Sequence, residues 1–556
     1  MKGIHNRLEG VVYTPADQAE QYFEKKLWLD LTVGDALRGT AARVPDRIAF
    51  ASEEGELTFR QLDEQSERLG AALLGLGVRP GERAMFQMGT VLETVVALSA
   101  CYKAGIIPVC SVPQYREIEI GQLARLSGAT LYFVQADFGA FDLVEFAHGM
   151  MQKLPSLSRL VVARAKKPGT FFDLHQLIEK ISLDDARQRL AKVKIGSEDC
   201  FVFQLSGGST GVPKIIPRFH GEYLAHCDSW NRMHGMDEHS VGIWSLPIIH
   251  NAGQIFGYMA AIHWGRTTVL TSRIDIPHIL DMIAKFRVTN AMSIGPIAPH
   301  LLAYQELAKH DLRSLRYFVA FSRADAIEAH LGGGAKSANL YGITEGLVLI
   351  SHPDDPPRAR HLTQGRTGQT GEEVRVLKLG TEEEAREGDI GELAFRGPSS
   401  LRGYYNAPEQ TREALTADEF FRTGDLVRAH RIEGRLYYSF EGRLKDNINR
   451  GGEKFGTEEV ENLIRQHPAV ADVAVVAMPD EMLIERACAY LVARAGMPAP
   501  DVKALGLFLE RKGMAKFKFP ERIELVDAFP VTRVGKLDKA QLRKTIAEKL
   551  AREKGG

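Results

Sequence analysis

The chain is poor in cysteine, and its five cysteines form no pattern. They are scattered and odd in number, and no C-x-x-C pair occurs, which indicates neither a disulfide framework nor a zinc site. Reduced, mostly buried thiols in a cytoplasmic protein are therefore expected. The first residues are not followed by an apolar segment, so no secretory signal is predicted. The most apolar region, residues 95–113, is interrupted by Lys103 and two prolines, which favours a core segment over a membrane span.

An excess of charge of one sign is also lacking. The 70 basic and 71 acidic residues leave a formal net charge of −1. A balance of this kind gives no strong field for nucleic acid or an anionic membrane, so neither partner is expected. No internal repeat of useful length and no low-complexity tract is apparent.

The length and the apolar pattern instead predict a multidomain α/β protein. At 556 residues the chain exceeds a single typical core, so at least two domains are expected. Residues 1–30 are polar with aromatic anchors and predict an arm wrapped over a larger body. A buried helix over 92–101 alternates with apolar strands, as in a mostly parallel sheet. These strands are expected at residues 106–112, 131–134, 160–162 and 201–203.

A glycine-rich loop follows the apolar run 201–203 and ends on Lys214. Glycine allows the backbone to approach a ligand closely, and successive N–H groups form a concavity suited to phosphate. The loop is not a Walker A motif, because Lys214 follows Pro213 and precedes Ile215. A flexible surface turn is the alternative, but the density of glycines and hydroxyls favours a polyphosphate site. The candidate residues are Ser206, Gly207, Gly208, Ser209, Thr210, Gly211 and Lys214.

The string S-G-G-S-T-G-V-P-K resembles the signature loop of the adenylate-forming superfamily, which includes acyl-CoA synthetases, luciferases and stand-alone aryl-acid ligases. Further motifs of that family follow in its order, beginning with Y-G-I-T-E at 341–345. The resemblance implies that the Tyr341 ring faces the adenine, that Thr344 contacts the α-phosphate, and that Glu345 binds Mg²⁺. Gly342 is placed with them among the nucleotide-binding residues. Magnesium that bridges phosphates usually takes only one or two protein carboxylates.

The later motifs continue this order to the end of the chain. Phe421-Arg-Thr-Gly-Asp425 reads as a tight glycine turn, and the resemblance assigns Asp425 to the ribose hydroxyls. Arg443 matches the arginine that contacts ribose or phosphate. Lys536 completes the final motif and is the expected catalytic lysine.

The resemblance also implies two domains joined by a hinge. A large region of α/β subdomains over 1–442 carries the ATP and acyl pockets, and a smaller mobile α/β domain over 443–556 carries the catalytic lysine. Lys445 falls at the hinge, where a few residues absorb large changes in φ and ψ. The small domain is expected to contain a helix capped by Thr457, and strands over 470–477 and 487–492.

The first candidate acyl-pocket residues end the stretch 242–251, which reads as a strand running into a loop. Taken alone, His250 and Asn251 are two loop residues satisfying nearby backbone. In aryl-acid ligases a His-Asn pair follows this strand, and its asparagine helps bind the ortho substituent of a salicylate-like ring. The resemblance therefore assigns His250, Asn251 and Phe256 to the acyl pocket, with His250 also in the catalytic set. Residues 252–257 depart from the Tyr and Ser pattern of a dihydroxybenzoate ligase.

A second departure concerns the adenine. Where the family shows a Gly-Gly-Ala-type contact, this chain has Ala320-Phe-Ser-Arg-Ala-Asp325, so Ser322 and Arg323 are the candidates there.

The function implied by the resemblance is ATP-dependent activation of a carboxylic acid, foremost a benzoate-, salicylate- or anthranilate-like acid. The products are an acyl-AMP and pyrophosphate, and the acyl group passes to the thiol of CoA or of a carrier protein's phosphopantetheine. Siderophore or other secondary-metabolite synthesis is a setting for such an enzyme. Two alternatives stay open: an acyl-CoA synthetase for aliphatic or alicyclic acids, and a non-catalytic adenylate-binding protein. The intact Lys536, Glu345 and Asp425 argue against the latter.

Overall fold

The computed structural model describes residues 2–206, 213–293, 297–332, 334–446, 448–450, 453–480, 483–512, 514, 516–532 and 536–555. The chain forms two compact units. The first comprises Met1–Glu373 with Phe395–Phe421, and the second comprises Val374–Ala394 with Arg422–Gly556. The α/β fold class predicted from the sequence is confirmed. The boundary expected after residue 442 falls inside the second unit, and its placement as a domain limit stays a prediction.

The first unit contains a seven-stranded sheet in which all neighbours are parallel except β8 and β9. Three of the predicted strands are confirmed, while the fourth, expected over 106–112, is limited to β4. Its backbone turns away after Val109, where the Ser111 N–H donates to the Val109 carbonyl. In sheet order the strands are β7 (Phe172–Asp173), β6 (Arg159–Ala163), β5 (Leu131–Gln135), β3 (Arg83–Gln87), β4 (Ile107–Val109), β8 (Cys200–Leu205) and β9 (Ile215–Phe219).

An eight-stranded sheet forms the other half of this unit. Its inner strands are parallel, and antiparallel strands β15 and β2 close its two edges. In order the strands are β15 (Val348–Ile350), β14 (Lys336–Gly342), β13 (Tyr317–Ala320), β12 (Asn290–Ser293), β10 (Val241–Trp244), β11 (Thr267–Leu270), β1 (Ile48–Ala51) and β2 (Glu56–Thr58).

Both sheets are buried on both faces, which explains their continuous apolar runs. Phe86 and Phe133 face a core shared with the eight-stranded sheet, whereas their neighbours Met85 and Tyr132 face a separate core. Side chains alternate in the same way on β13, where Val319 and Phe318 enter different cores. Two consecutive sheets therefore require three layers of helices.

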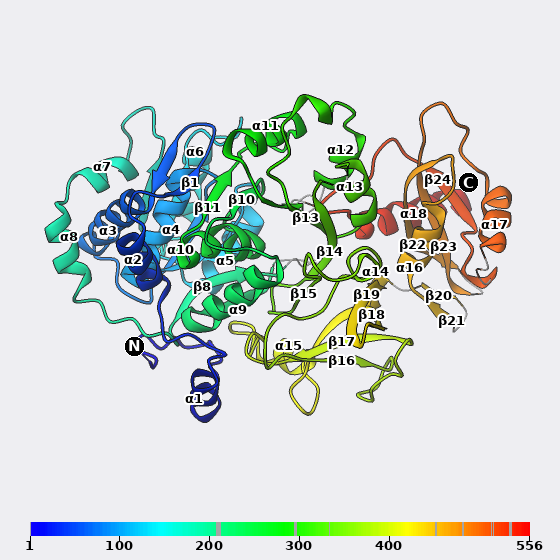
Figure 1. Cartoon of the computed structure of the whole chain (residues 1–556), viewed down its shortest axis with the longest axis horizontal. Coiled ribbons are helices and arrows are strands. Elements are labelled where there is room, and N and C mark those ends of the chain that lie inside the picture. Colours follow the sequence, from blue (N-terminus) through cyan, green and yellow to red (C-terminus); the bar gives the residue numbers. More distant parts are fainter. Residues whose placement is uncertain are drawn as a thin grey trace. The chain divides into compact units, whose positions relative to one another are not determined.

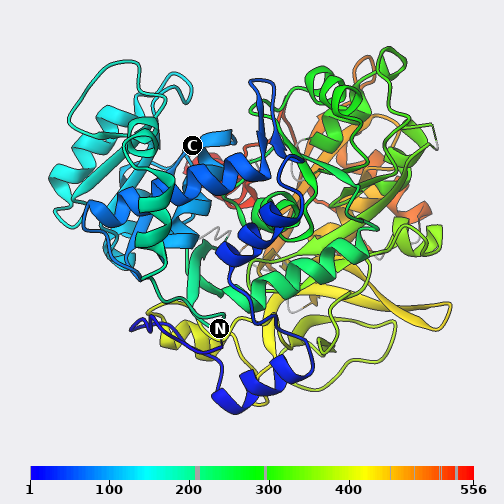
Figure 2. The ribbon, with the colours of Figure 1, turned by 60° about the vertical axis from the view of Figure 1, so that its left-hand side comes forward.

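The helices supply these layers, and Figures 1 and 2 show them around the two sheets. The shared core is filled by α2 (Val33–Arg43), α3 (Phe59–Gly75), α4 (Leu92–Ala104), α7 (Leu174–Glu179), α8 (Leu183–Leu190), α9 (His220–Met233) and α10 (Ala260–Trp264). The outer face of the seven-stranded sheet is covered by α5 (Glu117–Ser127) and α6 (Leu143–Lys153). The outer face of the eight-stranded sheet is covered by α11 (Ile276–Phe286), α12 (Ile297–Ala303) and α13 (Ala324–His330).

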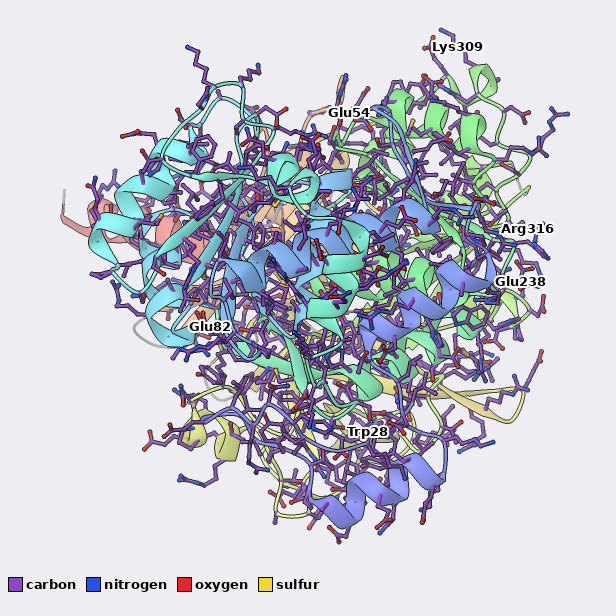
Figure 3. The ribbon with its side chains drawn as sticks, turned by 90° about the vertical axis from the view of Figure 1, so that its left-hand side faces the viewer. Trp28, Glu54, Glu82, Glu238, Lys309 and Arg316 are labelled. Atoms are coloured by element: carbon purple, nitrogen blue, oxygen red, sulfur yellow. The ribbon has the colours of Figure 1, made fainter. Side chains whose placement is uncertain are left out.

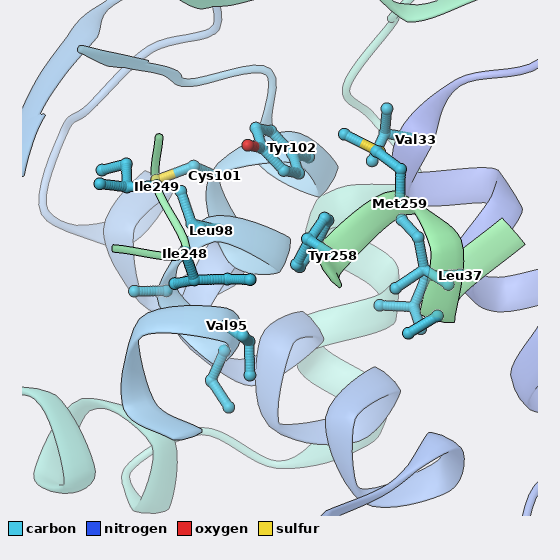
Figure 4. Close-up of a cluster of buried hydrophobic side chains, with 14 of the residues drawn as sticks. Val33, Leu37, Val95, Leu98, Cys101, Tyr102, Ile248, Ile249, Tyr258 and Met259 are labelled. Atoms are coloured by element: carbon cyan, nitrogen blue, oxygen red, sulfur yellow. The ribbon is translucent and has the colours of Figure 1, made fainter. Parts of the chain in front are cut away.

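Helix α4 lies in the middle of the shared core, as its apolar sequence predicts. Its residues Leu98 and Tyr102 lie near Ile248 and Tyr258 (Figure 4). The Ser99 hydroxyl and the Tyr258 hydroxyl form a hydrogen bond of 2.6 Å, so the buried polar atoms of this contact are paired. This packing anchors the segment that follows β10, where the candidate acyl-pocket residues begin.

The amino-terminal arm is tied to the first unit through its aromatic residues. Helix α1 (Ala16–Glu24) precedes Trp28, whose indole N–H donates to the Pro398 carbonyl at 2.8 Å. Figure 3 labels Trp28 beside this helix. The Asn406 N–H also donates to the Gly10 carbonyl, at 3.1 Å. The predicted arm therefore crosses to the segment that contains the short helix α15 (Pro408–Glu413).

The second unit contains two smaller sheets. One is formed by β16 (Glu373–Leu377), β17 (Ile390–Arg396), β18 (Phe421–Ile432) and β19 (Arg435–Arg443). The other is formed by β21 (Glu453–Phe455), β20 (Ile448–Arg450), β23 (Ile484–Ala493), β22 (Val470–Asp480) and β24 (Arg522–Leu525). Its helices are α16 (Thr457–Ile464), α17 (Val502–Arg511) and α18 (Lys539–Gly555).

One local expectation in this unit is wrong. Thr457 does not cap its helix but is the first residue of α16, and Gly456 precedes it as the cap. The Thr457 hydroxyl is buried and accepts a hydrogen bond from the Lys539 ammonium at 2.7 Å. The hydroxyl therefore bonds to this side chain and not to the backbone N–H groups of the helix. None of the helices among the described residues is long and apolar enough to cross a membrane.

Candidate active site

The glycine-rich loop leaves the seven-stranded sheet at the end of β8 and returns as β9. Two hydrogen bonds close its base: the Ser206 N–H donates to the Lys214 carbonyl at 2.9 Å, and the Lys214 N–H donates to the Ser206 hydroxyl at 2.9 Å. The candidates Gly207, Gly208, Ser209, Thr210 and Gly211 lie outside the described residues.

The Y-G-I-T-E motif lies at the carboxyl end of β14. Tyr341 is buried in that strand, Gly342 ends it, and Thr344 and Glu345 follow in the next turn. In mostly parallel sheets ligands bind beyond the carboxyl ends of the strands. The structure therefore places these candidates at the edge where a nucleotide site is expected.

Tyr404 joins this motif to the glycine-rich loop. Its hydroxyl donates to Glu345 Oε1 at 2.9 Å, and the Lys214 ammonium lies 4.2 Å from the centre of its ring. Burial, followed by the neighbouring Glu345 carboxylate, raises the pKa of Tyr404 well above its usual value, so the hydroxyl stays a donor. Tyr404 thus contacts two of the predicted site residues. Lys214, assigned to phosphate, lies over its ring, and Glu345, assigned to the metal, accepts from its hydroxyl.

Arg218 is a residue of this site that the sequence did not single out. It lies on β9, directly after the loop, and its side chain is buried. Its guanidinium pairs with Glu222 one helical turn later and donates to the Thr344 carbonyl at 2.8 Å and the Ser399 carbonyl at 3.3 Å. Arginine suits this position because its planar group offers several donors in a fixed geometry. It connects the strand after the loop to the turn that carries Thr344.

A second carboxyl group lies behind the same turn. The Ser399 hydroxyl lies 3.0 Å from Glu372 Oε2 and 3.1 Å from the Gly346 carbonyl oxygen, and its single hydrogen can be donated to either. Burial raises the pKa of Glu372 to about 7, and the Glu222 carboxylate adds to this rise. Ser399 thus connects Glu372 with Gly346, the residue that follows Glu345.

The candidate acyl-pocket residues lie on a helix rather than in the expected loop. After β10 a helical turn begins at Asn251 and continues as a π-helix over Gly253–Met259. Single-turn π segments are frequently found at functional sites. Because the π-helix widens each turn, its side chains depart from ordinary helical spacing. His250 precedes it, with its Nδ1 accepting from the Ala252 N–H at 3.3 Å.

The side chains of Asn251 and Phe256 contact helix α9. The Tyr223 hydroxyl donates to Asn251 Oδ1 at 2.7 Å, and both residues are buried. The Phe256 ring packs edge-on against Trp230, with ring centroids 4.1 Å apart. Helix α9 therefore contacts both Asn251 and Phe256. These contacts orient the amide of Asn251 and place an aromatic surface, formed by Phe256 and Trp230, on the same helix.

The adenine candidates lie at the end of β13, the strand next to β14. Ser322 and Arg323 are exposed, and Arg323 has a φ of 65°, in the left-handed region. Asn339 of β14 accepts a hydrogen bond from the Ala324 N–H at 3.0 Å, which fixes the turn. Ser322 and Arg323 thus lie at the same edge of the sheet as Tyr341.

The remaining candidates lie in the second unit. Asp425 and Arg443 are opposite each other in the β18–β19 ladder, with Arg443 Nε 3.3 Å from Asp425 Oδ1. The segment is part of a strand, not the expected tight turn, although Gly424 has a φ of 70°. The Asp425 N–H donates to the Thr423 hydroxyl at 3.1 Å, so the strand bends without leaving the ladder.

The last two candidates also have defined backbone positions. Lys445 lies in the 3₁₀ turn Leu444–Asp446, immediately after β19. Lys536 follows a segment outside the described residues, and its N–H donates to the Thr532 hydroxyl at 3.2 Å. The Thr532 N–H in turn donates to the Lys536 carbonyl at 2.6 Å, which closes a small loop.

The carboxylate of Glu345 is a ligand type that suits magnesium. Among the described residues, no three side chains of His, Cys, Asp or Glu gather in a metal-binding cluster. Glu345 offers a carboxylate next to the expected phosphate site, and magnesium bound with phosphates needs no more than one or two such groups.

Comparison with known proteins identifies the family of the chain. Residues 37–405 match the family described as AMP-binding enzyme, and residues 459–536 match the AMP-binding enzyme C-terminal domain. Pyochelin synthase PchD of Pseudomonas aeruginosa is 37% identical over 546 residues, covering 96% of each chain. The 2,3-dihydroxybenzoate-AMP ligase of Bacillus subtilis is 34% identical over 98% of this chain and 99% of its own.

A solved structure is similar over the same extent. The apo structure of MbtA from Mycobacterium smegmatis is 28% identical, with a TM-score of 0.71, and the match covers 96% of this chain and 98% of that chain. Both family matches fall in the order in which the motifs occur along the sequence. The chain therefore belongs to the AMP-binding enzyme family of adenylate-forming ligases.

Proposed function

We propose that this enzyme activates a salicylate-type aryl acid with ATP and transfers the acyl group to a phosphopantetheine thiol, the group that CoA and carrier proteins share. The observation that carries the choice of acid is the orientation of Asn251. Because its Oδ1 accepts from the Tyr223 hydroxyl, its Nδ2 hydrogens are left to donate. An ortho group that accepts a hydrogen bond suits this amide, and the Phe256–Trp230 pair supplies an aromatic wall.

Similar proteins support an aryl acid. Two full-length relatives are named for pyochelin synthesis and for 2,3-dihydroxybenzoate activation. The two matches cover 96% and 98% of this chain, so the aligned part includes the acyl-pocket region as well as the nucleotide motifs. The proposal takes from them the class of acid, while the preference for one ortho acceptor comes from this chain's own Tyr223–Asn251 contact.

The first half-reaction joins the acid to the nucleotide. A carboxylate oxygen attacks the α-phosphorus of ATP, the bond to the bridging oxygen breaks, and pyrophosphate leaves. Such reactions depend on positioning and charge neutralisation more than on covalent help from the protein. Lys214 and the glycine-rich loop hold the β- and γ-phosphates, the Thr344 hydroxyl contacts the α-phosphate, and Lys536 neutralises charge on the attacking carboxylate. Glu345 would hold Mg²⁺, whose charge would offset the negative charge of the phosphates.

The second half-reaction releases the nucleotide. The thiol sulfur attacks the acyl carbon, the bond from that carbon to the phosphate oxygen breaks, and AMP leaves. Asp425 and Arg443 hold the ribose, since a buried carboxylate paired with an arginine presents acceptors and donors to two hydroxyls. We propose that the small domain, which begins at residue 443, rotates about a hinge at Lys445 between the two half-reactions.

The acid preference gives the test of the proposed function. Pyrophosphate exchange into ATP should be faster with salicylate than with anthranilate, because an aromatic amine is a poor acceptor for Asn251. Asn251→Asp keeps an acceptor for Tyr223 but removes the donor, and should reduce the preference for salicylate about 10- to 100-fold. Asn251→Leu should also reduce it, leaving plain benzoate in use. Faster exchange with octanoate than with every aryl acid would refute the proposal.

Lys536 provides a second prediction. Lys536→Ala should reduce adenylate formation by about 100-fold or more, because charge neutralisation of this kind supplies several kcal/mol. Transfer from a supplied acyl adenylate to thiol should stay close to the wild-type rate. The two rates are measured separately by pyrophosphate exchange and by thioester formation. A similar loss in both half-reactions would contradict the role given to Lys536.

Arg218 provides a third prediction. Arg218→Lys keeps the charge but cannot reach Glu222, Thr344 and Ser399 together, so the turn that carries Glu345 loosens. Adenylate formation should fall about 10- to 100-fold, and more Mg²⁺ should be needed for half-maximal rate.

The matched control for this prediction is Arg266→Lys. Arg266 is equally buried and donates to the Ala260 carbonyl at 3.1 Å and to Asn231 Oδ1 at 2.7 Å, away from the nucleotide motifs. Its substitution should lower Tm without changing the Mg²⁺ requirement. The same Mg²⁺ requirement in both variants would show that Arg218 acts only on stability.

A further inference from the structure

A small cavity lies between helix α9 and strand β15 in the first unit. His226 and Trp230 line it from α9, Val348 lines it from β15, and Gln369 and Ser399 close it. Its walls are apolar on the side of Trp230 and Val348 and polar on the other side. None of the nucleotide motifs predicted from the sequence includes His226 or Gln369.

The two polar side chains fix each other's orientation. His226 Nδ1 and Gln369 Oε1 are 2.8 Å apart. Because an amide oxygen only accepts, the hydrogen lies on His226 Nδ1. Burial lowers the pKa of His226 to about 3, so the ring is neutral and its Nε2 carries a lone pair. The amide nitrogen of Gln369 is then directed away from the histidine as a donor.

Both remaining nitrogens are buried and have no partner among the residues that the structure describes. They are His226 Nε2 and Gln369 Nε2, and their residues are 3% and 8% exposed. Buried polar atoms are nearly always hydrogen-bonded, and one left unpaired costs about 1–3 kcal/mol. One unpaired acceptor and one unpaired donor on residues that line the same cavity call for one group that both donates and accepts.

We propose that this cavity is a binding site for one hydroxyl group, which donates to His226 Nε2 and accepts from Gln369 Nε2. A hydroxyl has one hydrogen and two lone pairs and satisfies both nitrogens at once. A carboxylate or a carbonyl offers no hydrogen to the histidine, and an ammonium offers no lone pair to the glutamine. The site therefore selects against charged groups of either sign.

The hydroxyl has two sources, a bound water or a second hydroxyl on the aryl acid. The cavity lies beside the proposed acyl pocket, because Tyr223, His226 and Trp230 are spaced along one face of α9. Tyr223 donates to Asn251 and Trp230 packs on Phe256. The second source rests on the proposed function, whereas the water site does not.

Crystal structures of the full chain, free and with salicylate or a dihydroxybenzoate, test the proposal. We expect an oxygen within about 3 Å of both Nε2 atoms in the wild-type protein. If water is the source, the same oxygen stays in every structure. If the acid is the source, a ring hydroxyl of the dihydroxybenzoate takes its place. Absence of an oxygen between the two nitrogens in all of them would overturn the proposal.

Variants separate the two sources in solution. Gln369→Met removes the donor and nearly keeps the volume. Its KM for the dihydroxybenzoate should rise about 10- to 100-fold relative to salicylate if the acid supplies the hydroxyl, and the ratio should stay unchanged if water does. The bound oxygen should be lost from the crystal structure of this variant in either case, and its persistence there would contradict the role of Gln369.

The matched control is Gln135→Met in strand β5. Gln135 is also buried and uses its amide to accept from the Gly89 N–H at 2.9 Å and to donate to Asp137 at 2.7 Å. Its substitution should lower Tm but leave both the ratio of KM values and the oxygen in the cavity unchanged. Because the structure of the free protein already reports on the cavity, failure of salicylate as a substrate is distinguished from failure of the hydroxyl site.

Discussion

The site depends on one buried ion pair, between Arg218 and Glu222. Taking both charges out of water is costly, and pairs of this kind seldom add stability over an apolar replacement. The position of the pair explains its role in the site. Arg218 lies on β9, just after the glycine-rich loop, and its guanidinium also donates to the carbonyls of Thr344 and Ser399. Two segments that are distant in sequence are thereby fixed around the place that we propose for the phosphates.

Helix α9 connects this ion pair to the proposed acyl pocket. Glu222 lies in its first turn, and Tyr223 directs the amide of Asn251. His226 and Trp230 follow on the same face, beside the small cavity and the Phe256 ring. One helix therefore joins the strand after the glycine-rich loop to the proposed ortho contact and the proposed hydroxyl site. Substitutions in its first turn are therefore expected to affect the binding of both the nucleotide and the acid.

Much of the fold was predictable because the two sheets of the first unit are buried on both faces and their strands are continuous apolar runs. The order of the motifs also indicated the family. Arg218 and Glu372 could not be found in this way, because their roles come from contacts such as Arg218 to Thr344, 126 residues apart. The π-helix after Asn251 and the bent strand at Gly424 depend on packing, which local sequence does not reveal.

The most direct test of the account follows the oxygen atoms of the acid. Salicylate with both carboxylate oxygens replaced by the heavy isotope is incubated with the enzyme, ATP, Mg²⁺ and CoA or a phosphopantetheinyl carrier, and the nucleotide is analysed by mass spectrometry. Attack of the carboxylate on the α-phosphorus predicts one heavy oxygen in the AMP released on thioester formation. Heavy oxygen in inorganic phosphate, or AMP without it, would contradict the acyl-adenylate mechanism.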